Sequence, residues 1–139
     1  MRSIALVFTV ALFIVSMLVP ATTSAWRWNV YNQTQNAIEA GGTEAAGRSL
    51  LNITIPAKGS APVNMTGALC LDYLYIYTPH CRIQPDNRFS YFIDCLGAGS
   101  ANNPLGGATC CWDKDVVVEE VGGTGTDGFP NCRVRLGTP

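Results

Sequence analysis

The segment Leu69-Cys70-Leu71-Asp72-Tyr73-Leu74-Tyr75-Ile76-Tyr77-Thr78 decides the fold class of this chain. Leucine, isoleucine and tyrosine are well suited to a pleated, half-buried surface, and Pro79 ends the run. Because successive side chains of a strand point to opposite faces, Leu74 and Ile76 should share one face and the tyrosines the other. The segment therefore predicts a strand with an apolar inner face and a row of three tyrosines on its other face.

Working outward from this strand, the same two-residue alternation recurs along the chain, and no stretch has a sustained helical period. Residues 33–48 should form a loop with one short helix or strand, and residues 97–109 and 122–130 should be glycine-rich loops. We expect an all-β fold, a disulfide-stabilised β-sandwich or small barrel of about seven or eight short strands. The other predicted strands cover residues 26–31, 51–55, 63–65, 88–96, 112–121 and 132–136.

The first 25 residues have the features of a secretory signal peptide. Arg2 is followed by the apolar run Ile4 to Val19 and by the small residues before Ala25, where cleavage is expected. The run is shorter than the roughly 20 residues that span a bilayer. We therefore expect a signal peptide over residues 1–25, a single secreted β-rich domain over 26–139, and no membrane span in the mature chain.

The charge balance excludes two classes of partner. Without Arg2 the chain keeps eight basic and ten acidic side chains, a formal charge of −2. Nucleic acids and anionic membranes select proteins with a basic surplus. We expect an extracellular protein or polysaccharide as the partner, and no nucleic acid.

An even number of cysteines in an exported domain predicts disulfide bonds rather than a metal site. The chain has no Cys-x-x-Cys pair and one histidine, so no metal or cofactor is expected. Three disulfides are predicted, with no bond between the adjacent Cys110 and Cys111, and the remaining pairings stay open. The six cysteines are Cys70, Cys81, Cys95, Cys110, Cys111 and Cys132.

Three Asn-x-Thr triplets begin at Asn32, Asn52 and Asn64. In a secreted chain such triplets are acceptors for N-linked glycans, which require a surface position. The strand register expected for residues 51–55 points Asn52 outward. We predict glycosylation at all three asparagines.

Candidate catalytic and calcium-binding residues form no strong motif. His80 lies in a turn beside Cys81, and no Gly-x-Ser-x-Gly sequence accompanies it. Asp72 and Asp94 fall in apolar strands and could serve a carboxylate-based hydrolase. The acidic residues Asp113, Asp115, Glu119, Glu120 and Asp127 lack the spacing of a known calcium loop.

The tyrosine row is the most suggestive candidate for a binding site. Tyr73, Tyr75 and Tyr77 each combine a flat apolar ring with a polar tip, which suits sugar rings or a protein partner. The alternative is a structural role, with the rings packed under a loop or a second sheet.

The whole chain resembles the small secreted cysteine-rich proteins of filamentous fungi, many of which are effectors or toxins. The resemblance is carried by the leader, the short mature chain and the even cysteines between Cys70 and Cys132. A fainter likeness to the start of thaumatin-like proteins is carried by Val30-Tyr31-Asn32 and Gly47-Arg48-Ser49-Leu50, although that family has more cysteines. The first resemblance implies an extracellular binding protein of the effector or toxin type; a carbohydrate-binding module and a small hydrolase remain as alternatives.

Overall fold

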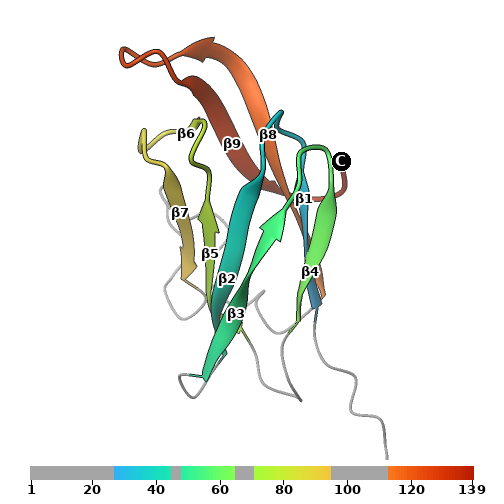
Figure 1. The fold of residues 1–139 in the computed structure, drawn as a ribbon. Coiled ribbons are helices and arrows are strands. Elements are labelled where there is room, and N and C mark those ends of the chain that lie inside the picture. The colour runs from blue at the N-terminus through green and yellow to red at the C-terminus, as the bar shows by residue number, and fades with distance from the viewer. Residues whose placement is uncertain (1–26, 45–47, 65–70, 95–112) are drawn as a thin grey trace, which may run out of the picture.

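A computed structural model describes residues 27–44, 48–64, 71–94 and 113–139 of the 139-residue chain. All regular structure in these ranges is β, which confirms the all-β prediction, and they contain no helix that could cross a membrane. Figure 1 shows the strands in chain order. They are β1 (Arg27–Asn32), β2 (Ile38–Glu44), β3 (Arg48–Ile55), β4 (Ser60–Asn64), β5 (Leu71–Tyr77), β6 (Arg82–Ile83), β7 (Ser90–Asp94), β8 (Lys114–Thr124) and β9 (Pro130–Leu136).

The strands form two sheets. One has five strands in the order β4-β1-β8-β9-β6, and the other has four in the order β3-β2-β5-β7. β1 pairs with β8 and β6 with β9 in parallel, and the other pairs are antiparallel. The first strand therefore lies beside a strand that follows it by more than 80 residues (Figure 1).

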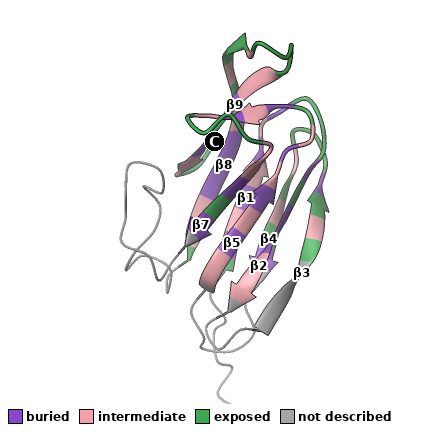
Figure 2. Cartoon of the chain, turned by 90° about the vertical axis from the view of Figure 1, so that its left-hand side faces the viewer, coloured by how far each residue is buried: buried purple, intermediate pink, exposed green. Residues whose placement is uncertain are grey.

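The two sheets share one hydrophobic core. Figure 2 shows buried and more exposed positions alternating along the strands, as a sheet with one covered face requires. The inward position of Leu74 and Ile76 confirms the prediction from the two-residue period, whereas Ile38 and Ala40 enter the core from a segment expected to be mainly loop. From the five-stranded sheet the core takes Trp28, Val30, Val63, Ile83, Val116, Val118, Cys132 and Val134, and from the other Ile38, Ala40, Ile55, Leu74, Ile76, Tyr91 and Ile93.

The described residues form nine strands where seven or eight were expected, and three elements show the largest differences. β2 is a seven-residue strand where a loop with one short element was expected, β8 continues to Thr124 into the second glycine-rich segment, and the short β6 was not predicted. Glycine has low strand propensity, which is why the pattern around Gly41 and Gly42 did not favour a strand. The loop predicted over 97–109 lies outside the described residues.

Gly42 is needed because the backbone of β5 passes against it. A Cβ at this position would collide with the main-chain carbonyl oxygen of Tyr73, whereas a Cβ at Gly41 would meet the amide oxygen of the Asn52 side chain. A side chain can turn away and a paired backbone cannot. We expect Gly42→Ala to lower the free energy of unfolding by about 1–3 kcal/mol and Gly41→Ala by less than about 1 kcal/mol. Urea unfolding of both variants checks this, and equal losses would contradict it.

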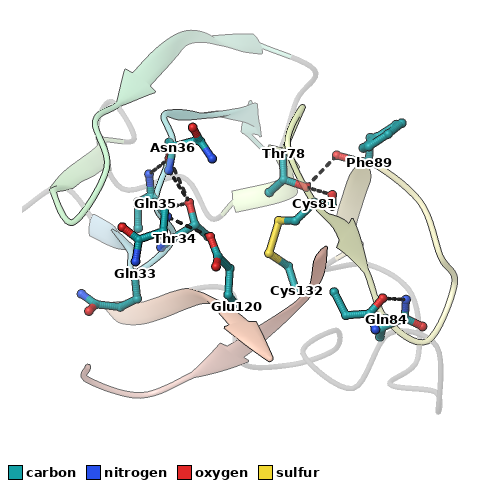
Figure 3. The surroundings of a disulfide bond; sticks show 12 residues. Gln33, Thr34, Gln35, Asn36, Thr78, Cys81, Gln84, Phe89, Glu120 and Cys132 are labelled. Carbon is teal, nitrogen blue, oxygen red and sulfur yellow. Dashed lines mark hydrogen bonds between the residues drawn. A yellow bond between two sulfur atoms is a disulfide. The ribbon is translucent and has the colours of Figure 1, made fainter. Parts of the chain in front are cut away.

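One disulfide lies within the described residues. Cys81, in the turn that leads from β5 to β6, is bonded to Cys132 of β9, and both are buried (Figure 3). The Thr78 hydroxyl donates to the carbonyl oxygens of Cys81 and Phe89, which fixes the turn. The bond thus fastens the crossover between the two sheets to β9. Cys70, Cys95, Cys110 and Cys111 lie outside the described residues, so the other two predicted disulfides stay predictions.

Candidate aromatic binding face

Four aromatic side chains gather on the outer face of the four-stranded sheet. Tyr73, Tyr75 and Tyr77 alternate along β5 with the core residues Leu74 and Ile76. Phe92 alternates in the same way between the core residues Tyr91 and Ile93 of β7, and it pairs with Tyr75 in the sheet. We call Tyr73, Tyr75, Tyr77 and Phe92 the aromatic face. The sequence predicted the tyrosine row, and the structure adds Phe92 to it.

The rings of the aromatic face support one another. The Phe92 ring centroid lies 5.1 Å from that of Tyr73 and 5.2 Å from that of Tyr75, both at tilted angles. The Tyr75 and Tyr77 rings are 6.4 Å apart and parallel to within 5°. These separations fall in the range of favourable aromatic pairs. The rings are therefore held in place before any ligand arrives.

The face is partly accessible to solvent. Phe92 is 41% exposed, the highest value among the large hydrophobic side chains that the structure describes, and the three tyrosines are half-buried. Within the described ranges no second sheet covers these rings, because the shared core lies on the opposite side of β5 and β7. Within the described ranges the tyrosine row is therefore not packed beneath a second sheet, and its binding role stays a prediction.

Polar groups border the aromatic face on β2 and β3. Glu39 pairs with Tyr77 in the sheet, and Asn52 lies over Gly41, which pairs with Tyr75. Burial raises the pKa of the Tyr75 hydroxyl, and the negative charge of Glu39 and the neighbouring Tyr77 raise it further. Tyr75 therefore stays protonated well beyond neutral pH and can both donate and accept a hydrogen bond.

The outer face of the five-stranded sheet is different in character. Glu119 accepts hydrogen bonds from the guanidinium groups of Arg133 and Arg135. Val117, which pairs with Tyr31 on one side and Arg135 on the other, is fully buried. The charged groups Glu119, Arg133 and Arg135 on this face are already paired with one another. It therefore offers less uncommitted surface to a ligand than the aromatic face does.

The pairing of Glu119 predicts a pH effect. Hydrogen bonds from Arg133 and then Arg135 lower the pKa of the Glu119 carboxyl below its usual value. A depressed folded-state pKa stabilises the protein above the unfolded-state pKa, and this contribution is lost as pH falls through the folded-state value. We expect Glu119→Gln to lower stability by up to about 1 kcal/mol at pH 7 and to have little effect near pH 2. Thermal midpoints of both proteins across this pH range measure it, and a pH-independent difference would contradict it.

The candidate catalytic residues are not brought into one site by the described structure. His80 is exposed in the β5–β6 turn, Asp72 is half-buried, and the side chain of Asp94 lies outside the description. The acidic residues considered for calcium have separate partners: Asp113 accepts from the Arg27 amide and Asp115 from the Asn29 side chain. Within the described ranges no three His, Cys, Asp or Glu residues are grouped to hold a metal ion.

The three glycosylation triplets have different surroundings. Asn52 is exposed on β3, as predicted, and the side chain of Asn64 lies outside the description. The expectation that Asn32 lies on the surface is wrong, because Asn32 is fully buried. Its Nδ2 donates to the carbonyl oxygens of Asn36, Ile55 and Pro56, and its Oδ1 accepts from the amide and hydroxyl of Thr34. Figure 3 shows the turn that follows Asn32, where the Gln35 amide donates to Glu120.

A second aromatic cluster was missed by the sequence analysis. The Arg82 guanidinium lies 3.7 Å from the centroid of the Phe89 ring and forms an ion pair with Asp127. The Phe89 ring in turn meets the Phe129 ring edge-on. These residues come from three segments that are separate in the sequence, so no single periodic pattern marks the cluster. Because Arg82 is already committed to Asp127 and both rings, the cluster is explained as packing that joins the β8–β9 hairpin to β6.

No protein-family model, curated protein or solved structure matches the chain. Function is therefore inferred from the aromatic face and from the features of the sequence.

Proposed function

We propose that this protein is a secreted, disulfide-stabilised β-sandwich that binds an extracellular ligand through its aromatic face, in the manner of an effector or toxin-like protein at a host or competitor surface. The observation that carries the proposal is the gathering of four aromatic rings on the outer face of a sheet whose other side forms the core. Isolated exposed aromatics are ordinary, whereas a contiguous exposed apolar patch marks an interaction site.

The arrangement of the rings favours binding energetically. Tyrosine contributes large contact area, and its hydroxyl remains able to hydrogen-bond at the edge of an interface. Because the rings already contact each other at 5.1–6.4 Å, little side-chain entropy remains to be lost on binding. Such pre-ordered aromatic anchors are typical of interface hot spots.

Secretion is supported by the sequence and agrees with the disulfide. The leader over residues 1–25 has the order of charge, apolar run and small residues that export requires. The bond between Cys81 and Cys132 is of a kind that persists in oxidising compartments.

A carbohydrate ligand is the second candidate, and one observation favours it. The parallel rings of Tyr75 and Tyr77 repeat along the strand, with the carboxylate of Glu39 beside them as a hydrogen-bond acceptor. Flat apolar rings with adjacent polar groups match the alternation of C–H faces and hydroxyls in a polysaccharide.

Substitutions on the aromatic face test the proposal. We expect Tyr75→Ala and Phe92→Ser each to weaken binding at least tenfold, because each removes a central ring of the face. Binding is measured by sedimentation with insoluble cell-wall polysaccharides and by retention on intact host or competitor cells. The matched control is Tyr31→Ala, which removes a half-buried tyrosine from the outer face of the other sheet. Equal losses in the control, or unchanged binding in both face variants, would contradict the assignment of the site.

The same measurements separate the two ligand classes. Retention on cells that is abolished by protease treatment of the cell surface indicates a protein partner. Binding to a purified polysaccharide that Tyr75→Ala removes indicates the carbohydrate-binding function instead.

A further inference from the structure

We propose that Asn52 carries an N-linked glycan whose first sugar packs across Gly41 against Tyr75, and that Asn32 stays unmodified in the folded protein. The proposal concerns a ligand carried by the chain itself. It stands whether or not the aromatic face binds an external partner.

The acceptor asparagine, Asn52, lies at the surface of the protein. Asn52 and Thr54, the two specified residues of the triplet, are both exposed on β3. Along β3 they alternate with Ile53 and Ile55, which contact the core, so both belong to the outer face of the four-stranded sheet. A glycan on Asn52 is thus compatible with the fold, and it would leave from the same side of the sheet as the aromatic face.

The Asn52 side chain is directed toward the neighbouring strand β2. A Cβ at Gly41 would collide with its amide oxygen and lie 3.1 Å from its Cγ. The amide therefore leans from β3 across the neighbouring strand β2. Its oxygen faces Gly41, and a sugar attached to the Nδ2 of the same carboxamide would start close to β2 rather than beyond the edge of the sheet.

The aromatic face begins on the far side of Gly41 from Asn52. Gly41 pairs with Tyr75 on β5, and Tyr75 pairs with Phe92 on β7. Neighbouring strands are about 4.8 Å apart, so the Tyr75 backbone is only about 10 Å from that of Asn52. Gly41 has no side chain, and the Asn52 carboxamide occupies the place above it. An N-acetylglucosamine ring attached to this carboxamide would bring its C–H groups to Tyr75 and form a border of the aromatic face on its β3 side.

Asn32 differs from Asn52 in its burial. The Nδ2 atom of Asn32, to which a sugar would be attached, is buried and donates to three carbonyl oxygens at 2.7–3.1 Å. A glycan there would replace one of the two Nδ2 hydrogens that these carbonyl oxygens share, and it would have to fit at a fully buried atom. A chain modified at Asn32 cannot adopt this fold, so the folded product should be modified at Asn52 and not at Asn32.

The test uses the full chain secreted from a eukaryotic host, with an enzymatic trim of the glycan to a single N-acetylglucosamine. Peptide mapping should find that sugar on Asn52 and an unmodified Asn32. Nuclear Overhauser contacts should connect the sugar ring to the Tyr75 ring. The matched pair Thr54→Ser, which keeps the triplet, and Thr54→Ala, which removes it, should differ in thermal midpoint by about 4 °C in this host and not in a non-glycosylating host.

Three results would overturn the proposal. They are an unmodified Asn52 in the secreted product, a glycan on Asn32 of the folded protein, or a sugar on Asn52 that makes no contact with Tyr75. All are measured without an external ligand, so they are independent of the binding test above. Loss of external binding in Phe92→Ser with no sugar contact to Tyr75 would retain the proposed function and reject this inference.

Discussion

Replacing Cys81 and Cys132 together by alanine is expected to lower the free energy of unfolding by about 4 kcal/mol. The bond closes a loop with a sequence separation of 51 residues, and the loop-entropy model assigns about that value to a loop of this length. Both residues are buried in the core, so truncation also removes packed atoms. For a domain of this size the loss corresponds to a fall of about 10–20 °C in thermal midpoint.

The double variant is preferable to chemical reduction, because a reductant acts on all six cysteines. Urea unfolding of the oxidised wild type and of the double variant gives the difference directly. The single variants serve as controls, since each should lose as much stability as the double variant and leave one reactive thiol. A loss below about 1 kcal/mol in the double variant would show that the crossover between the sheets does not depend on this bond.

The second large effect is expected at Asn32. Asn32→Asp keeps the shape of the side chain but replaces the Nδ2 donor by a carboxylate oxygen that faces the carbonyl oxygens of Asn36, Ile55 and Pro56. Each buried acceptor left without its donor costs about 1–3 kcal/mol, and burial of the new charge adds to this. We expect a total loss of about 4 kcal/mol, enough to unfold a marginal domain at physiological temperature.

Asn52→Asp is the matched control for this prediction. It changes the same residue type in the same triplet pattern, but at an exposed position, and should alter stability by less than about 0.5 kcal/mol. Both proteins are made in an oxidising, non-glycosylating host so that no glycan contributes. Chemical denaturation that finds similar losses at the two positions would contradict the structural role of Asn32.

The contrast between these two asparagines shows where the sequence stops being informative. Both begin an Asn-x-Thr triplet, and the alternation of Leu51, Ile53 and Ile55 was enough to place Asn52 outside. Asn32 is buried because of its contacts with Ile55 and Pro56, which lie more than 20 residues away and which no local pattern shows. The only local signal was the neighbouring Thr34, whose hydroxyl and amide close a turn on the Asn32 oxygen.

The strands could be predicted from local sequence, whereas their pairing could not. One covered face imposes the two-residue period of Leu74 and Ile76, so the sequence of β5 is sufficient to predict it. The parallel pairing of β1 with β8 depends on contacts between distant segments. Gly42 was a misleading signal, because the close approach of the Tyr73 backbone requires glycine in the middle of a strand.

The aromatic face was predicted in part. The spacing of Tyr73, Tyr75 and Tyr77 placed three rings on one side, but Phe92 belongs to a strand whose position beside β5 is set by tertiary pairing. Its contacts with both Tyr73 and Tyr75 turn a row on one strand into a patch across two. The patch is therefore a property of the sheet and not of either segment alone.

Hydroxyl-radical footprinting of the protein bound to its target surface tests the central claim most directly. We expect the oxidation of Tyr75, Tyr77 and Phe92 to fall at least fivefold on binding, while that of Tyr31 on the opposite sheet stays the same. Protection of Tyr31 with unchanged oxidation of the aromatic face would place the ligand on the other sheet and contradict the account.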